Sequence, residues 1–134
     1  MRTQPWAKGQ PLDLLLADDD EDTRFIVKRA LAKLGAAVHV HEAANGEEAL
    51  TLLRERRVDA ILTDYRMPLA TGVEVLCFAR HAQPHAKRIL MSGTLEEAVL
   101  REAALPACLD FCFEKPMQRE EWMKLLRLGL EIET

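Results

Sequence analysis

The chain has 134 residues, of which 49% are hydrophobic and 30% are charged, so it is long enough for one globular domain with its own core. Its formal net charge of −4 argues against a nucleic-acid-binding protein, which needs an excess of Lys and Arg. No apolar run reaches the ~20 residues that span a bilayer, and residues 1–11 lack the apolar core of a signal peptide. We therefore expect a cytoplasmic protein without nucleic-acid or membrane partners, with a flexible tail over residues 1–11 and one domain over residues 12–132.

Short apolar runs alternate with helical patterns along the chain. In the first helical pattern, Ile26, Ala30 and Leu34 lie on one apolar stripe, with Val27 and Leu31 beside it. Five strands that alternate with helices predict a doubly wound α/β fold, whose parallel sheet is covered on both faces. The predicted strands cover residues 12–17, 37–42, 60–64, 88–91 and 109–113, and the predicted helices cover residues 22–34, 47–56, 96–104 and 119–130, with another from residue 73 to Pro84.

Carboxylates follow two of the predicted strands at the point where each strand ends. Residues 18–22 are five consecutive acids after the first strand, and Asp64 ends the central strand. Ligands of open α/β sheets bind outside the carboxyl ends of the strands, so these acids are expected to converge. Because like charges repel unless a cation neutralises them, and hard carboxylate oxygens suit Mg²⁺, the sequence predicts a magnesium site. A calcium loop is excluded, because Thr23 and Arg29 stand where an EF-hand needs glycine and glutamate.

Two further polar residues end the fourth and fifth strands. Ser92 is followed by Gly93, which leaves space beside it, and Lys115 is followed by Pro116. A hydroxyl group and a cation, beside a carboxylate nucleophile and a metal site, are the parts that bind and neutralise a transferring phosphoryl group. The pattern therefore predicts phosphoryl transfer at Asp64.

In order and spacing, these motifs resemble the response-regulator receiver domain of two-component signalling, of the chemotaxis CheY type. The resemblance implies a flavodoxin-like five-stranded parallel sheet in the order 2-1-3-4-5. The motifs that carry it, within residues 12–130, are Asp18-Asp19, Asp64 in T-D-Y-R-M-P, Gly72, Ser92 and Lys115-Pro116.

The resemblance also implies how Mg²⁺ and the phosphoryl group are bound. Asp64 would accept the phosphoryl group from the phosphohistidine of a sensor histidine kinase or phosphotransfer protein, and the chain would not be an enzyme beyond this self-catalysed transfer and its reversal by hydrolysis. Asp19, Asp64 and the backbone carbonyl of Arg66 would hold Mg²⁺, with Asp18 acting through water. The neighbouring Asp20 is expected to face solvent or cap the next helix.

Phosphate binding and phosphate lifetime are implied for four residues. Ser92 and Lys115 would hold the phosphate. Arg66 and Thr94, two positions beyond Asp64 and Ser92, would set how long it survives, because hydrolysis needs a water in line with the bond.

The output face would signal to a downstream protein target or a fused output domain. In the family, a hydroxyl at the Ser92 position moves inward and an aromatic ring on the last strand follows it. Here Cys112 stands at the position of that ring, between Phe111 and Phe113 on the opposite face, so we expect an altered switch. Thr71 also replaces the usual Asp or Asn before the glycine. The face is implied to comprise residues 96–104, 109–113 and 119–130.

Two other functions remain open from the residues. One is a protein-interaction module of receiver fold that is never phosphorylated. The other is a phosphohydrolase of the haloacid-dehalogenase type that uses Asp18 and Asp20, but Asp22 stands where that family needs Thr or Val.

The three cysteines, Cys77, Cys108 and Cys112, form no C-x-x-C pair and lie among apolar neighbours. An odd number of cysteines in a cytoplasmic protein indicates reduced thiols with a packing role. We therefore expect no disulfide.

Overall fold

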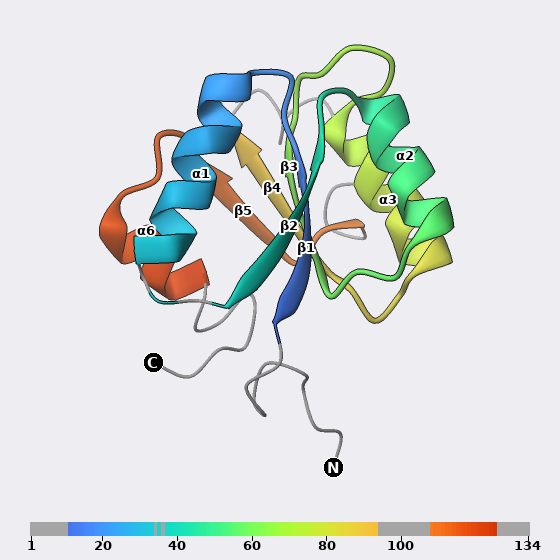
Figure 1. Cartoon of the computed structure of the whole chain (residues 1–134). Coiled ribbons are helices and arrows are strands. Elements are labelled where there is room, and N and C mark those ends of the chain that lie inside the picture. The colour runs from blue at the N-terminus through green and yellow to red at the C-terminus, as the bar shows by residue number, and fades with distance from the viewer. Residues whose placement is uncertain (1–10, 34, 36, 94–107, 126–134) are drawn as a thin grey trace.

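The computed structural model describes residues 11–33, 35, 37–93 and 108–125. Its centre is a five-stranded sheet in the order β2-β1-β3-β4-β5, and all neighbouring strands are parallel (Figure 1). The predicted flavodoxin-like fold and its strand order are therefore confirmed. The strands are β1 Leu12–Ala17, β2 Val38–Ala43, β3 Ala60–Asp64, β4 Lys87–Ser92 and β5 Phe111–Glu114.

Helices cover both faces of the sheet. α1 and α6 lie on one face, and α2 and α3 lie on the other (Figure 1). In this part of the chain, no helix is long and apolar enough to cross a membrane. The predicted helix 96–104, the end of the last helix and most of the predicted tail lie outside the described residues. The helix bounds are α1 Glu21–Lys33, α2 Gly46–Glu55, α3 Gly72–Ala82 and α6 Arg119–Lys124.

The core consists of two apolar clusters, one on each face of the sheet. Leu15 of β1 packs toward α2 and α3 together with Leu76, whereas Leu16 packs toward α1 and α6 together with Val27 and Trp122. Successive strand residues point to opposite faces, so a strand that is covered on both sides is apolar throughout. This explains why residues 14–17 of β1 and 60–62 of β3 are apolar on both faces, shortly before the carboxylates of Asp18 and Asp64.

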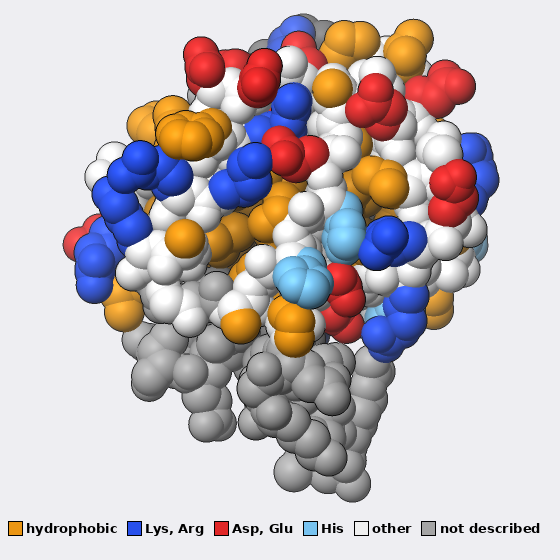
Figure 2. Space-filling view, viewed as in Figure 1, with side chains coloured by type: hydrophobic (Ala, Val, Ile, Leu, Met, Phe, Trp, Pro, Cys, Tyr) orange, Lys and Arg blue, Asp and Glu red, His pale blue; other side chains and the backbone are white. Residues whose placement is uncertain are grey.

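The orientation of α1 corrects one prediction. Ile26 was predicted to lie on the main apolar stripe with Val27 and Leu31 beside it, but Ile26 is 62% exposed, whereas Val27 and Leu31 are buried. Leu34 lies outside the described residues. Arg24 and Lys28 of α1 form ion pairs with Glu42 of β2, at 2.9 and 2.8 Å. These contacts accompany an orientation in which Val27 and Leu31 pack into the core, and hydrophobic side chains are left exposed over α1 (Figure 2).

The start of β5 also differs from the prediction. This strand begins at Phe111 instead of residue 109. Before it, Asp110 pairs with Arg88 of β4 twice, because its amide donates to the Arg88 carbonyl at 2.7 Å and its carboxylate accepts from the Arg88 amide at 2.9 Å. The Asp110 carboxylate therefore takes the place of a backbone carbonyl as the acceptor for the Arg88 amide.

Candidate metal centre

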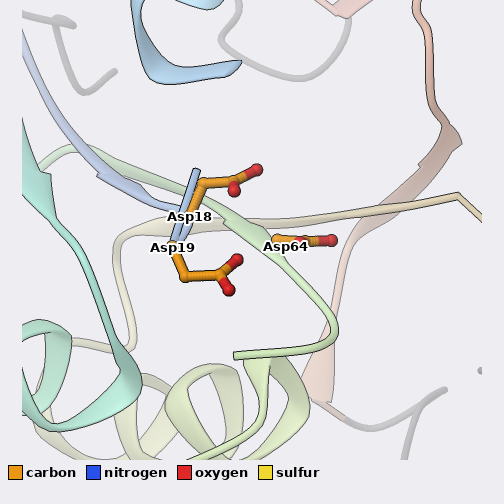
Figure 3. Close-up of side chains that lie close together, drawn as sticks. All are labelled: Asp18, Asp19 and Asp64. Atoms are coloured by element: carbon orange, nitrogen blue, oxygen red, sulfur yellow. The ribbon is translucent and has the colours of Figure 1, made fainter. Parts of the chain in front are cut away.

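The carboxyl ends of β1, β3 and β5 bring four of the predicted site residues together. Asp18 and Asp19 follow β1, Asp64 ends β3, and Lys115 follows β5. The three carboxylates lie close together (Figure 3), and one oxygen from each lies within 4.8 Å of the others. Parallel strands produce this arrangement because their equivalent ends meet at one edge of the sheet.

Asp18 is fully buried and hydrogen-bonded through both carboxylate oxygens. Oδ1 accepts from the amide of Asp20 at 2.9 Å, and Oδ2 accepts from Nζ of Lys115 at 2.9 Å. The backbone carbonyl of Asp18 accepts from Nη1 of Arg24 at 2.6 Å. A buried carboxylate is costly unless it is paired in this way, so these contacts hold the turn after β1 in place.

Asp20 lies in the same run of acids but has a different role. Its Oδ1 accepts from the amide of Asp22 at 2.9 Å, and its Oδ2 accepts from the hydroxyl of Thr23 at 3.0 Å. The hydrogen bond from Thr23 and that from the Asp22 amide lower the pKa of Asp20. The side chain therefore caps α1 and is exposed, as the sequence predicts.

Asp64 and Lys115 are coupled electrostatically. Oδ1 of Asp64 accepts from the Tyr65 amide at 2.9 Å, and its Oδ2 lies 3.3 Å from Nζ of Lys115. Burial raises the pKa of Asp64, and the nearby charge of Asp18 adds to the rise, while Lys115 opposes it without cancelling it. Burial by itself would lower the pKa of Lys115, but its hydrogen bond to Asp18 and the charge of Asp64 raise it above its usual value. Lys115 is therefore a cation that balances part of the charge of three carboxylates.

Ser92 and Lys115 lie on neighbouring strand ends. Ser92 is buried, and its carbonyl accepts from the Lys115 amide at 2.9 Å. A side chain added at Gly93 would meet nothing within 4 Å, so there is open space next to Ser92. The Lys115–Pro116 peptide bond is cis. This part of the site thus combines a buried hydroxyl group and an ammonium group on neighbouring strand ends.

Residues 14–127 match the family model described as the response regulator receiver domain. The chain belongs to this family. It is 36% identical to sensor kinase CckA of Brucella abortus (strain 2308) over 121 residues. The matched segment covers 88% of this chain but only 12% of that kinase. It is 31% identical to chemotaxis protein CheY of Thermotoga maritima over 105 residues, and the matched segment covers 78% of this chain and 86% of CheY. A CheY-like receiver domain from Methanospirillum hungatei has a TM-score of 0.76 at 26% identity, with 91% of this chain and 95% of that one covered.

The loop after β3 of this receiver passes directly under Asp64. The Gly72 amide donates to the Tyr65 carbonyl at 2.8 Å, and a Cβ at Gly72 would overlap the carbonyl oxygen of Asp64. Thr71 caps α3, because its hydroxyl accepts from the Glu74 amide at 3.2 Å. Threonine thus serves as the helix cap where the family usually has Asp or Asn.

The structure describes only one of the two residues that are predicted to set phosphate lifetime. Arg66 is exposed, two positions beyond Asp64. Thr94 lies outside the described residues. The roles of both stay predictions.

The alternation predicted for β5 is confirmed in this receiver. Phe111 and Phe113 stack with ring centroids 6.4 Å apart and pack on the α1 and α6 side, whereas Cys112 packs on the α2 and α3 side. Cys112 is paired with Leu90 of β4. Burial raises the pKa of the Cys112 thiol. Neither phenylalanine therefore occupies the position of the family's aromatic ring.

The expectation of three reduced cysteines is wrong for two of them. Cys77 of α3 and Cys108, just before β5, form a disulfide with their Cα atoms 4.9 Å apart, and Cys112 is free. The two are 31 residues apart in the sequence, so no local spacing motif marks the pair. The fold brings them together by placing α3 beside the chain that leads into β5.

Arg24 is a site residue that the sequence analysis missed. It links the Asp18 carbonyl to Glu42 of β2, and so connects the turn carrying the acids to the edge of the sheet. One signal was available: a basic residue in the first turn of a helix opposes the helix dipole and needs another reason to be there.

Proposed function

We propose that this receiver accepts a phosphoryl group on Asp64 from the phosphohistidine of a sensor histidine kinase or a phosphotransfer protein. One observation carries the proposal: the Asp64 carboxylate lies 3.3 Å from Lys115 and within 4.8 Å of the oxygens of Asp18 and Asp19. A nucleophile, a cation and a set of oxygen ligands therefore meet at one point. In this role the chain is a cytoplasmic phosphoacceptor and not an enzyme with a separate substrate.

The donor set fits Mg²⁺. The three carboxylates carry more negative charge than Lys115 balances, and hard oxygen ligands with room for several waters are what this ion prefers. Asp19, Asp64 and the backbone carbonyl of Arg66 would hold it, with Asp18 acting through water. When bound, Mg²⁺ supplies positive charge to the oxygens of the transferring phosphoryl group.

The chain's own residues position the reaction. A carboxylate oxygen of Asp64 attacks phosphorus, a P–O bond forms and the P–N bond to the donor histidine breaks, with the imidazole as leaving group. Lys115 is held by Asp18 at 2.9 Å, so its ammonium group is placed beside the phosphoryl oxygens without needing to move far. Ser92 lies one position beyond Met91, the residue paired with Asp64 in β4, and its hydroxyl is proposed to bind another of these oxygens.

Signalling is proposed to pass from this site to a face around β5 and α6 that contacts a downstream protein target or a fused output domain. Ser92 would move toward the phosphate, and in the family an aromatic ring would follow it. Cys112 is too small to do so. Coupling is therefore expected to be weaker, or to be carried by movement of helices instead of a ring.

The haloacid-dehalogenase alternative is not supported by the geometry. It requires Asp18 and Asp20 to act in one site, but both carboxylate oxygens of Asp20 are engaged in capping α1. The interaction module without phosphorylation remains the rival that an experiment must separate.

Intact-mass analysis after treatment with acetyl phosphate and Mg²⁺ tests the proposal. The wild-type chain should gain one phosphoryl group, Asp64→Ala should gain none, and Asp22→Ala, a control at an exposed acid, should behave like wild type. An adduct of undiminished yield in Asp64→Ala would refute the assignment, and no adduct on a folded wild-type chain would favour the interaction module. Followed over time, the same assay on Arg66→Ala and Thr94→Ala should show changed phosphate lifetimes.

A further inference from the structure

Two cysteines from distant parts of the chain meet on the α3 side of the sheet, away from the acids of the metal centre. Cys77 lies in the middle of α3, and Cys108 lies just before β5. We propose that this pair is a reversible redox modification site, oxidised by a hydroperoxide, whose disulfide restrains β5 against α3. The redox site could exist whether or not the proposed function is right. The effect of the disulfide on signalling, however, rests on the proposed function.

The fold does not depend on the disulfide. On this face of the sheet, Leu76 and Ala79 of α3 are fully buried against β3 and β4, and Cys77 packs against the same cluster. Cysteine thiols behave as small apolar side chains, so two reduced cysteines would fill the same positions without leaving a polar group unpaired. A domain of this size with a continuous core needs no crosslink to fold. Both redox states are therefore folded, which a reversible site requires.

The compartment predicted from the sequence also favours reversibility. In the cytoplasm, thiol reductants keep most cysteines reduced, and the disulfides that do form there are mainly transient or redox-sensing. A pair of cysteines held within bonding distance by a folded core would be reduced at rest and oxidised when a peroxide appears.

The exposure of the two cysteine residues sets the order of the chemistry. Cys77 is partly exposed and Cys108 is buried, so the peroxide reaches Cys77 first. The Cys77 thiolate attacks the O–O bond: an S–O bond forms, the O–O bond breaks and the departing oxygen takes a proton to give an alcohol or water. The Cys108 sulfur then attacks the Cys77 sulfur, the S–S bond forms and the hydroxyl group leaves as water with the proton of Cys108. Two thiols are oxidised by two electrons, and one hydroperoxide is reduced.

Cys112 provides an internal reference on the same face of the sheet. It packs against the same cluster as Cys77 but is free. Burial raises the pKa of its thiol, so less of it is present as the reactive thiolate. The oxidised protein should therefore retain one free thiol, and that thiol should be Cys112.

The position of the crosslink gives it a consequence for signalling. β5 is an edge strand, bonded to β4 on one side. It carries Cys112 and leads to Lys115, which contacts Asp64. When phosphate draws Ser92 at the end of β4 toward Asp64, β5 has to shift with it, because the Lys115 amide donates to the Ser92 carbonyl. A bond from Cys108 to α3 holds the start of β5 in place. The oxidised receiver should therefore transmit a smaller change to its output face.

The first experiment counts thiols. Reduced, folded protein is treated with one equivalent of hydrogen peroxide, alkylated and weighed intact. Wild type should fall from three alkylated thiols to one, and recover three after dithiothreitol without denaturant. Cys112→Ser should still form the bond, whereas Cys77→Ser and Cys108→Ser should not. Three alkylated thiols after peroxide, a disulfide through Cys112, or a bond that only denaturant makes reducible would each overturn the proposal.

The second experiment measures the effect on signalling by amide chemical shifts, with beryllofluoride and Mg²⁺ as the phosphoryl mimic. Residues around Asp64 should shift in both redox states. Shifts across Phe111–Glu114 should be at least about twofold smaller in the oxidised form, since the shift follows the population that changes conformation. In Cys77→Ser these shifts should be the same with and without peroxide. Equal shifts in both states would overturn the restraint, whereas no shift at Asp64 in either state would overturn the proposed function and leave the thiol count standing.

Discussion

The acids at residues 18–22 show how like side chains in one run acquire different surroundings. Asp18 is buried against Lys115, Asp19 is exposed with its carboxylate close to those of Asp18 and Asp64, and Asp20 caps α1. The difference follows from the end of β1, because the first residue after a buried strand is still inside and each later residue lies farther out. Composition alone would describe all five as a solvated acidic loop.

Asp64→Asn is expected to stabilise the protein in magnesium-free buffer near neutral pH. Burial raises the pKa of Asp64 above its ordinary value of 3.8, so the folded state binds this proton more tightly than the unfolded state. The stability contributed by the protonated group is fully present below pH 3.8 and is lost as pH rises through the folded pKa. An amide does not ionise, so the variant avoids this loss. Urea denaturation with a chelator present should show a gain in the free energy of unfolding at neutral pH.

The pH dependence separates this cause from a packing effect. The gain from Asp64→Asn should shrink as pH falls through the folded pKa and vanish below pH 3.8, where the wild-type carboxyl becomes protonated in both states. The exposed control Asp22→Asn should change the free energy of unfolding by less than about 0.5 kcal/mol. A gain that does not vary with pH, or a loss of stability, would contradict the explanation.

Contacts between elements hold the loops that carry the site. Gln83, at the end of α3, is buried and its side chain bonds three backbone groups. It accepts from the Val58 amide at 2.8 Å and donates to the carbonyls of Leu53 and Arg56 at 2.9 and 2.7 Å. One amide side chain thus provides hydrogen-bond partners for backbone groups at the end of α2 and in the segment before β3. It also links both segments to α3.

Gly72→Ala should be strongly destabilising, because α3 begins directly against the end of β3. The added Cβ would overlap the Asp64 carbonyl oxygen and lie 3.0 Å from Cδ1 of Leu90. Backbone cannot move as easily as a flexible side chain, so we expect a loss of about 1–3 kcal/mol in the free energy of unfolding, as in overpacked cores. Urea denaturation is the measurement.

Gly93→Ala is the matched control for that substitution, because a Cβ there meets nothing within 4 Å. Its stability should stay within about 0.5 kcal/mol of wild type. If the two variants lost the same stability, close approach at Gly72 could not be the reason.

Binding of Mg²⁺ should stabilise the receiver as a whole, since an ion that binds the folded state alone shifts the folding equilibrium. The increase in the free energy of unfolding should reach about 2.7 kcal/mol at roughly 100 times the dissociation constant. Asp19→Ala should lose most of this increase. Asp20→Ala should keep it, although this variant should be less stable without Mg²⁺ because it has lost the helix cap. The quantity compared is the difference between urea denaturation with and without Mg²⁺, and equal losses in the two variants would count against the division of roles between these acids.

Much of the architecture was predictable from local patterns. The apolar runs that end at Ala17 and Asp64 have the length and composition of buried strands, and their alternation with helical patterns predicts a parallel sheet. A parallel sheet then places Asp18, Asp64 and Lys115 at one edge. Strand order came from the resemblance to receivers, and the structure confirms it. These features were accessible because each depends on residues that are close in sequence or on a general rule of topology.

Other features were decided by the tertiary structure alone. Ile26 is exposed because Val27 and Leu31 are the α1 residues that pack into the core, and the Cys77–Cys108 bond forms because α3 lies beside the entry to β5. The hydrogen bond from Lys115 to Asp18 joins residues 97 positions apart. Local periodicity specifies which residues tend to be buried, but not which distant partner each one meets. That choice is made by the packing of helices on the sheet, where the contacts of all the elements are satisfied together.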